Sequence, residues 1–360
     1  HKGQAVLSPE EKRRFATSGG DPKAWRAANA DRLGPFGVCS ALKLDVGIGA
    51  TFEQAWAVEF KLVGNRDQFG GVVDVAVGHP ERVEERDGLD HFRLDMPAEW
   101  PGKYRVRKRI EEKSSVASGR LESRQAYIEL EDVTRGLTVR LDAGHITDMR
   151  TGSAGALGLK YIATHAINRV AILGTGRVAR TLTLACDALF DLDEIRCTSR
   201  SAEKRDAFAS DMEPRISTRL HMTDSQSECL DEVDALLSAV PTPEPILDVR
   251  ATEAIDYLVI VGGDSRTRQV ENAVLEKRPV LVDLWEQASV SGEFRWAQDM
   301  GTAGQIALAR GEDGRVLTVG DAAQGDVQIA RGCVYLTGIA AQDLCAAAVV
   351  YKRWLERDAT

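Results

Sequence analysis

Short apolar runs and a longer stretch of small apolar residues alternate between residues 168 and 201. Residues 170–173 form an apolar run that ends at Gly174, and residues 194–198 form a second run. The stretch between the two runs is rich in Ala and Leu. Short apolar runs bounded by turn residues are typical of buried strands, and a longer Ala- and Leu-rich stretch is typical of a helix. The sequence therefore predicts a strand, a turn, a helix and a second strand in this order.

Strand and helix patterns continue to alternate after residue 201. The pattern predicts a helix over 202–212 and strands over 216–222, 234–240, 257–261 and 279–284. Strands that alternate with helices usually form a parallel sheet with helices on both faces. We therefore expect a doubly wound α/β domain in this part of the chain.

The residues before position 151 follow a different pattern. Strands are expected over 127–130 and 137–141, with Arg135-Gly136 as the turn between them. Helices are expected from Ser8, over 51–62, after Arg150 and over 339–355.

The turn after the first strand reads Gly174-Thr175-Gly176-Arg177-Val178-Ala179. Gly174 permits a tight turn, Gly176 lets the backbone approach a pyrophosphate, and Ala179 keeps the following helix close to the sheet. The first N–H groups of that helix have no partner within the helix and are available to phosphate oxygens. The strand, turn, helix and second strand together predict a dinucleotide site.

The end of the second strand bears on which dinucleotide binds. An Asp or Glu at this place hydrogen-bonds the ribose hydroxyls of NAD, whereas this chain has Thr198-Ser199-Arg200-Ser201. Hydroxyls and a guanidinium can bind a 2′-phosphate, which a carboxylate would repel. We favour NADP(H) over NAD(H). The alternative is that Arg200 is a solvated loop residue and NAD is held in another way.

Composition restricts the class of protein. The 360 residues are enough for two domains, and 43% hydrophobic with 28% charged residues is ordinary for a globular protein. A net charge of −9 argues against general binding to nucleic acid or to an anionic membrane. No apolar run has the length of a membrane-spanning helix, and no signal-peptide core is present at the start. We expect a cytoplasmic protein.

The cysteines and histidines give no sign of a metal site. The six cysteines form no CxxC pair, and Cys186 and Cys197 fall inside apolar patterns that predict buried core thiols. Five of the six histidines are scattered along the chain without paired carboxylates, at His79, His91, His145, His165 and His221. We therefore expect no metal.

Five short motifs occur in an order and spacing that match a known family over roughly residues 75–355. They are Met96-Pro97-Ala98, residues 146–154 (ITDMRTGSA), Gly174-Thr175-Gly176, residues 261–264 (VGGD) and residues 337–344 (TGIAAQDL). In this combination the sequence resembles the ornithine cyclodeaminase/μ-crystallin family, which includes ketimine reductases and some alanine dehydrogenases. The first 75 residues have no counterpart that we can match.

The resemblance implies two domains and an oligomer. Residues 1–150 plus 325–360 would form an α+β substrate-binding and dimerisation domain, and residues 151–324 a Rossmann domain with a doubly wound parallel sheet. The family's substrate domains pair, so the resemblance implies a homodimer.

Asp264 follows two glycines at the end of a predicted parallel strand, which is where ligands bind in open α/β sheets. From the residues alone, Asp264 could equally cap the helix that begins near Arg266. The resemblance places Asp264 on the family's catalytic carboxylate. Its implied role is to hold the substrate nitrogen and assist proton transfer there.

Lys108 aligns with the family's substrate-binding lysine, which implies a contact with the substrate carboxylate and a part in proton transfer. Arg107 and Arg109 flank it, and in a strand they point to the opposite face. A shift of one residue would change the assignment. A solvated basic strand face is the alternative, so which of the three faces the substrate stays open.

The resemblance also implies contacts for several arginines. Arg82 aligns with an arginine that clamps the substrate carboxylate, although its charged surroundings fit a surface residue equally well. Arg150 and Thr151 correspond to a pair beside the cofactor phosphates and the substrate carboxylate. Arg268 is either a second substrate contact or a charge on a helix surface. The full set of candidate cofactor contacts is Arg150, Thr151, Gly174, Thr175, Gly176, Arg177, Val178, Ser199, Arg200, Val240 and Gly262.

The chain departs from the family's cyclodeaminases in two places. Leu94 stands where a glutamate is expected before the Met-Pro pair, and Ser199 stands where an NAD-binding aspartate is expected. Both weaken the assignment as an ornithine- or lysine-type cyclodeaminase that releases ammonia with NAD(P). The leading hypothesis is an NADP(H)-dependent enzyme that reduces the C=N bond of a small α-imino (ketimine) acid or runs the reverse amino-acid dehydrogenation. A cofactor-binding protein without catalysis is a third possibility.

Overall fold

The computed structural model describes residues 82–87, 91–115, 121–262, 267–324, 327 and 329–358. The described residues form two compact units. Thr151–Thr337 make up one, and the described residues up to Arg150 together with those from Gly338 onward make up the other. The helices expected from Ser8 and over 51–62, and Asp264 itself, lie outside the described residues.

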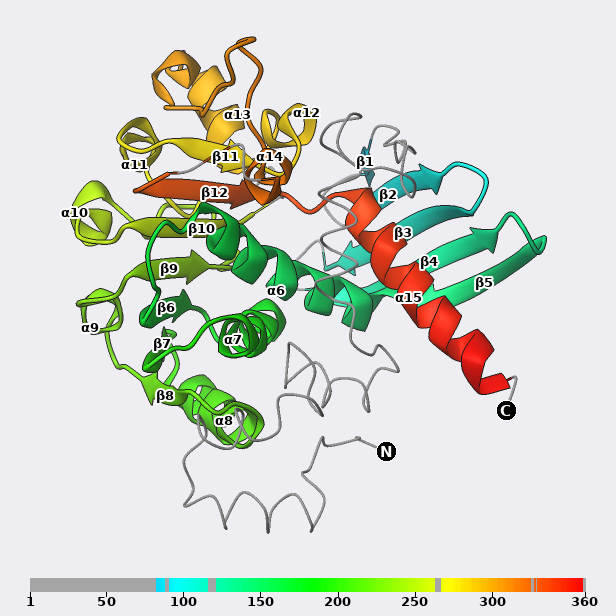
Figure 1. The fold of residues 1–360 in the computed structure, drawn as a ribbon, viewed down its shortest axis with the longest axis horizontal. Helices are drawn as coiled ribbons and strands as arrows, with labels where there is room; N and C mark the ends of the chain where they lie inside the picture. Colours follow the sequence, from blue (N-terminus) through cyan, green and yellow to red (C-terminus); the bar gives the residue numbers. More distant parts are fainter. Residues whose placement is uncertain are drawn as a thin grey trace. The chain divides into compact units, whose positions relative to one another are not determined.

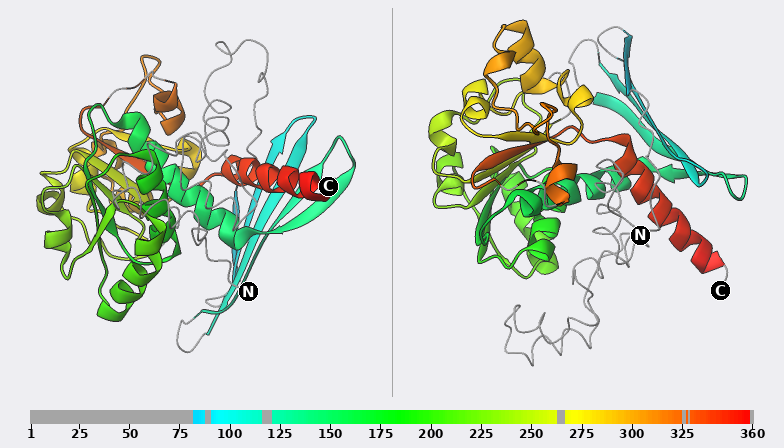
Figure 2. Two further views of the ribbon diagram at one scale, coloured as in Figure 1. Left: turned by 60° about the horizontal axis from the view of Figure 1, so that its bottom comes forward. Right: turned by 45° about the horizontal axis from the view of Figure 1, so that its top comes forward.

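The unit that contains the chain's described beginning and end is an antiparallel sheet covered by a helix (Figure 1). Its strands, in the order β1-β2-β3-β4-β5, are β1 (Val83–Asp87), β2 (His91–Trp100), β3 (Tyr104–Ser114), β4 (Leu121–Asp132) and β5 (Leu137–Asp142). The C-terminal helix α15 (Ala340–Asp358) packs against β2, β3 and β4, and Figure 2 shows it running across the sheet.

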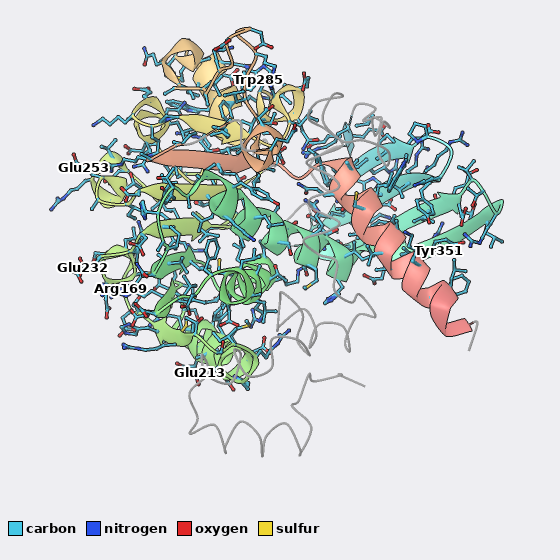
Figure 3. The ribbon with its side chains drawn as sticks, viewed as in Figure 1. Arg169, Glu213, Glu232, Glu253, Trp285 and Tyr351 are labelled. Carbon is cyan, nitrogen blue, oxygen red and sulfur yellow. The ribbon has the colours of Figure 1, made fainter. Side chains whose placement is uncertain are left out.

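A buried carboxylate anchors α15 to this sheet. Tyr351, which projects from α15 in Figure 3, donates a hydrogen bond of 3.1 Å to Asp132 at the end of β4. Asp132 also accepts from the hydroxyl of Thr134 at 2.6 Å and from the guanidinium of Arg135 at 2.8 Å. Burial alone would raise the pKa of Asp132, but these hydrogen bonds outweigh burial and hold that pKa well below its usual range.

The other unit is a seven-stranded parallel sheet in the order β11-β12-β10-β9-β6-β7-β8. Its strands are β6 (Arg169–Leu173), β7 (Glu194–Thr198), β8 (Arg219–Met222), β9 (Ala235–Ser238), β10 (Tyr257–Val261), β11 (Val280–Val282) and β12 (Gly332–Leu336). Within this sheet the first strand is β6, which lies in the middle. The chain runs outward from it through β7 and β8, and then returns to β9 on the other side of β6. The sheet therefore has its topological switch point between β6 and β9, as in dinucleotide-binding folds.

Helices cover both faces of the parallel sheet. Successive residues of each strand point to opposite faces, so each face has its own set of side chains for the helices to pack on. One face packs Leu236, Leu258 and Tyr335 against apolar residues of the helices that follow the later strands. The longer helices of this unit are α6 (Ala143–Ile162, which begins in the other unit), α7 (Arg177–Leu189), α8 (Ala202–Met212) and α13 (Gly292–Asp299). The short ones are η1 (Glu213–Arg215), α9 (Gln226–Leu230), α10 (Val249–Thr252), α11 (Asn272–Glu276), α12 (Trp285–Ala288), η2 (Ala303–Gln305) and α14 (Val319–Ala323).

The small residues of α6 allow close packing on the opposite face. A Cβ placed on Gly152 would lie 2.4 Å from the backbone of Thr181 in α7, and one on Gly155 would lie 2.4 Å from Leu182. A Cβ on Gly158 would lie 3.0 Å from Val334 of β12. Glycines three residues apart thus bring the helix backbone directly onto α7 and the sheet.

The predicted doubly wound parallel sheet and its α+β companion are both present. The strand over 194–198 and the helix over 202–212 have the expected bounds. The helix expected after Arg150 begins earlier, at Ala143, because the side chain of Asp142 accepts from the N–H of Gly144 at 2.7 Å and caps it.

The expected domain boundary at residues 324 and 325 differs from the compact units. β12 pairs with β10 and β11 inside the parallel sheet, so this unit extends to Thr337. The roles of substrate binding and dimerisation stay predictions.

The described cysteines are all buried free thiols, as expected for Cys186 and Cys197. No group of three or more His, Cys, Asp or Glu side chains able to hold a metal occurs in the described ranges. Within the same part of the chain, no helix combines the length and the apolar character needed to cross a bilayer.

Candidate functional site

The glycine turn lies at the carboxyl end of β6, beside the switch point. Gly174 has φ +101°, a conformation that other residues rarely adopt. Its N–H donates to the carbonyl of Thr198 at 2.9 Å, which ties the turn to the end of β7. A Cβ on Gly174 would lie 3.5 Å from Val240, which follows β9. The two predicted cofactor contacts Gly174 and Val240 are therefore neighbours at the switch point.

Gly176 is the N-cap of α7, and no side chain caps this helix. A Cβ placed on Gly176 would meet no atom of the described residues within 4 Å, its chain neighbours aside. Gly176 and Arg177 are both exposed, so this end of α7 is accessible in the described part of the chain. A helix N-terminus of this kind attracts anions through its backbone dipoles. The turn therefore fits the pyrophosphate of a dinucleotide.

Arg180, which the sequence analysis did not single out, braces the turn. Its Nη1 donates to the carbonyl of Thr175 at 2.5 Å and to that of Gly176 at 3.3 Å. Its Nε donates to Asp211 of α8 at 2.8 Å. The guanidinium thus ties the carbonyls of the turn to α8. Its place in the first turn of α7, four residues after Gly176, is the sequence signal that points to this role.

The end of β7 presents hydroxyls and guanidinium groups. The hydroxyl of Thr175 donates to that of Ser199 at 3.1 Å. Arg205 of α8 donates to the carbonyl of Ser199 at 2.6 Å and to Asp224 at 2.5 Å, whereas Arg200 is exposed. The backbone of Ser199 is thus held by Arg205, and its contact with a cofactor stays a prediction.

Gln269 joins the carboxyl ends of β9 and β10. Its Oε1 accepts from the N–H of Val240 at 2.9 Å and from the hydroxyl of Ser238 at 2.7 Å, and its Nε2 donates to the carbonyl of Val261 at 2.8 Å. Gly262, which follows β10, donates to Leu336 of β12 at 2.8 Å. These bonds hold the carboxyl ends of β9, β10 and β12 together.

Arg268 has a clear contact. Its guanidinium lies 4.1 Å from the centre of the Trp296 ring. The backbone N–H of Arg268 donates to the carbonyl of Thr242 at 2.8 Å. The side chain is therefore stacked on an aromatic ring of α13. A contact with substrate stays a prediction.

The antiparallel unit contains a buried cluster of charges. The ammonium of Lys108 on β3 lies 2.6 Å from Oδ2 of Asp343 on α15, and Nε of Arg150 on α6 donates to Oδ1 of the same carboxylate at 3.2 Å. Lys108 is 1%, Arg150 6% and Asp343 0% exposed. Two predicted site residues from separate elements therefore meet on one carboxylate.

The alternation of β3 shows which basic residue faces inward. Lys108 lies between the buried Val106 and Ile110, on the face covered by α15. Arg107 and Arg109 point to the other face, where both lie near Asp95 of β2 at 3.4 and 3.6 Å. Lys108 is therefore the buried residue of the three, and its contact with substrate stays a prediction.

The surroundings of Lys108 alter its acidity. Burial lowers the pKa of Lys108 to about 8, because a buried ammonium loses its hydration. Asp343 acts in the opposite direction, whereas the positive charges of Arg150 and Arg82 lower the pKa further. Arg82 lies near this cluster and forms an ion pair with Glu84.

The start of α15 holds Arg150 in place from two sides. Nη1 of Arg150 donates to the side-chain oxygen of Gln342 at 2.6 Å. Gly338 has φ +76°, and a Cβ there would lie 2.4 Å from Nη1. The guanidinium therefore packs directly against the backbone before α15. Gln342 and Asp343 lie in the last of the five family motifs but are not among the predicted site residues, although an acid in the mostly apolar first half of a helix is a signal for a buried charge.

The model of the ornithine cyclodeaminase/mu-crystallin family matches residues 74–358, which is most of the chain. The chain belongs to this family. The residues of both the glycine turn and the buried charge cluster lie inside the matched range.

Members of the ornithine cyclodeaminase/mu-crystallin family resemble this chain in sequence and in fold. Alanine dehydrogenase of Archaeoglobus fulgidus is 28% identical over 221 residues, which is 61% of this chain and 66% of that protein. Among solved structures, Thermococcus litoralis Δ1-pyrroline-2-carboxylate reductase with NADH and L-proline has a TM-score of 0.72 at 20% identity, covering 88% of this chain and 97% of that one. An archaeal alanine dehydrogenase dimer with bound NAD has a TM-score of 0.70 at 22% identity, covering 87% and 94%. The sequence match thus spans about two thirds of the dehydrogenase, and the structural likeness shows a shared fold.

Proposed function

We propose that this protein is an NADP(H)-dependent enzyme that reduces the C=N bond of a small α-imino acid, or catalyses the reverse dehydrogenation of an amino acid. The family contains reductases and dehydrogenases that use nicotinamide cofactors, and the glycine turn at the switch point fits a dinucleotide. The observation that carries the proposal is the buried cluster of Lys108, Arg150 and Asp343.

The charge balance of this cluster suggests an anionic substrate. Lys108 and Arg150 carry two positive charges, and Asp343 carries one negative charge. Unbalanced buried charge is costly unless a partner compensates it. The carboxylate of an α-imino or α-amino acid has the missing charge, and a guanidinium with an ammonium is well suited to bind it. Arg82, whose side chain is 13% exposed, is the third proposed carboxylate contact.

The reaction needs a hydride and a proton. When bound, the reduced nicotinamide supplies the hydride, two electrons with one proton, to the imine carbon. Asp264 is the proposed group at the substrate nitrogen, where its charge stabilises the iminium ion that accepts the hydride. Lys108 is the proposed carboxylate contact that also shares in proton transfer, and its pKa of about 8 suits that role.

The choice of NADP(H) rests on the end of β7. Ser199 and Arg200 stand where an acid would hold NAD, and Arg205, which is paired with Asp224, holds the carbonyl of Ser199 in place. A 2′-phosphate needs hydroxyls and cations of this kind. The two solved relatives hold NAD and NADH, so their cofactors do not supply this preference.

The assembly and location of the protein are also proposals. One relative in the same fold is a dimer, and we propose a homodimer formed through the antiparallel unit. We propose a cytoplasmic location, in keeping with the buried free thiols.

The purified protein can be tested with both cofactors and two classes of substrate, cyclic imino acids and diamino acids. We expect loss of NADPH absorbance with Δ1-pyrroline-2-carboxylate or Δ1-piperideine-2-carboxylate. Release of ammonia from L-ornithine or L-lysine with added NAD(P), without net change of cofactor, would instead establish a cyclodeaminase. Cofactor binding without turnover of any of these compounds would favour a binding protein.

A further inference from the structure

Asp343 is the point at which the two buried cations of the antiparallel unit are joined. Its two carboxylate oxygens are divided between them, with Oδ1 on Arg150 Nε at 3.2 Å and Oδ2 near Lys108 Nζ at 2.6 Å. Because β3, α6 and α15 each supply one member, no single element fixes the distance between the two cations. The shared carboxylate and the packing of the three elements fix it.

We propose that Asp343 is a positioning residue that sets the spacing of Lys108 and Arg150 for a substrate carboxylate and keeps Lys108 protonated. This inference rests on the proposed function. A carboxylate that served only to neutralise one buried cation would have one partner, whereas Asp343 has two. It therefore holds two cations close together that would otherwise repel each other.

The second part of the proposal concerns the charge of Lys108. Among the described residues, the charged groups that act on its ammonium are Asp343 from α15, Arg150 from α6 and Arg82 before β1. The neighbours across the sheet, Met96 on β2 and Ile128 on β4, carry no charge. Asp343 is thus the negative charge that opposes burial and the two arginines.

The variant Asp343→Asn removes this charge and keeps the shape. A lysine that must be protonated gives activity that is present below its pKa and lost as the pH rises through it. In the parent, kcat/KM for a cyclic ketimine should therefore fall above about pH 8. Without Asp343 the pKa of Lys108 is lower, so in Asp343→Asn the fall should begin at a lower pH. KM should also rise because the two cations lose their common partner.

Three further variants serve as controls. Gln342→Met removes a hydrogen bond to Arg150 but changes no charge, so the pH at which kcat/KM falls should stay near the parent's. Asp343→Glu keeps the charge and alters the spacing, so KM should rise while that pH stays nearly the same. Lys108→Arg cannot lose its proton in this range, so the alkaline fall should disappear. Asp343→Glu and Lys108→Arg keep the proposal testable if Asp343→Asn does not fold.

Calorimetry supplies a measurement that does not depend on turnover. L-proline is titrated into the protein with bound NADPH, a pair between which no hydride can be transferred, in two buffers of different ionisation enthalpy. A bound carboxylate raises the pKa of Lys108, so the parent should take up protons most strongly near or above pH 8. In Asp343→Asn this maximum should move to lower pH.

Two results would overturn the inference. One is an Asp343→Asn variant whose activity drops equally at every pH with an unchanged alkaline fall, which indicates a structural role alone. The other is a proton uptake that is the same in parent and variant. Failure of the proposed function is a different result: the parent then neither turns over imino acids nor binds L-proline.

Discussion

The hydroxyl of Thr175 donates to the hydroxyl of Ser199 across 3.1 Å, which links the glycine turn after β6 to the end of β7. The two loops that would hold the pyrophosphate and the adenosine ribose are therefore joined directly. Arg205 fixes the carbonyl of Ser199 at 2.6 Å from the other side. A substitution in these loops should therefore change the affinity for the cofactor without unfolding the protein.

The first prediction concerns cofactor preference. The protein should bind NADPH more tightly than NADH. Arg200→Ala should weaken the binding of NADPH about 5- to 100-fold, which is the effect of losing a hydrogen bond to a charged group. NADH binding should change little, because NADH has no 2′-phosphate. Titration of cofactor fluorescence measures both constants. Lys204→Ala is the control, because it removes another exposed cation from α8, the helix that follows the loop with Arg200. Tighter NADH than NADPH binding in the parent would contradict the prediction.

The second prediction concerns Gly176. Gly176→Val places methyl groups in the space before α7 that none of the described residues fills, so it should abolish cofactor binding. The thermal midpoint should move little, since loss of a glycine N-cap costs about 1 kcal/mol or less. Gly152→Ala is the contrast, because its Cβ would meet the backbone of Thr181. That variant should lose roughly 1–3 kcal/mol of unfolding free energy. Retained NADPH affinity in Gly176→Val would show that the nucleotide binds elsewhere.

The third prediction concerns Asp264. Asp264→Asn keeps the size and a capping oxygen but removes charge and basicity. Loss of acid–base assistance should lower kcat with a cyclic ketimine and NADPH about 100- to 10,000-fold. Cofactor affinity and the thermal midpoint should stay close to those of the parent. Turnover within a few-fold of the parent would leave Asp264 as a helix cap only.

The fourth prediction concerns stability in acid. The pKa of Asp132 is held below its usual range by hydrogen bonds, so its contribution is fully present above the unfolded-state pKa of about 4. As the pH falls below that value, the contribution should decrease. Asp132→Asn should lose roughly 1–3 kcal/mol of unfolding free energy at neutral pH, and the difference from the parent should shrink in acid. Urea unfolding of both proteins from pH 7 to pH 3 tests this, and a constant difference would disprove it.

Local sequence was enough for much of the parallel unit. The apolar run that ends at Gly174 and the run over 194–198 each form a strand in register with the other. Such runs are decided by neighbouring residues, since strand, turn and helix signals lie within a few positions of one another. The glycine turn was predicted for the same reason, because φ +101° at Gly174 is a property of one residue in its own turn.

Other features depended on contacts between distant residues. The sequence of β3 allowed Lys108 or its arginine neighbours to face inward, and the packing of α15 on this sheet decided for Lys108. Asp343 meets Arg150, which lies 193 positions earlier in the chain, and no local pattern specifies such a pair. β12 belongs to the parallel sheet because its backbone pairs with β10 and β11. The sequence by itself therefore determined the strands, the turn and the types of charged residue available. The tertiary structure alone decided which charges meet, because burial and pairing are set by elements that come together only on folding.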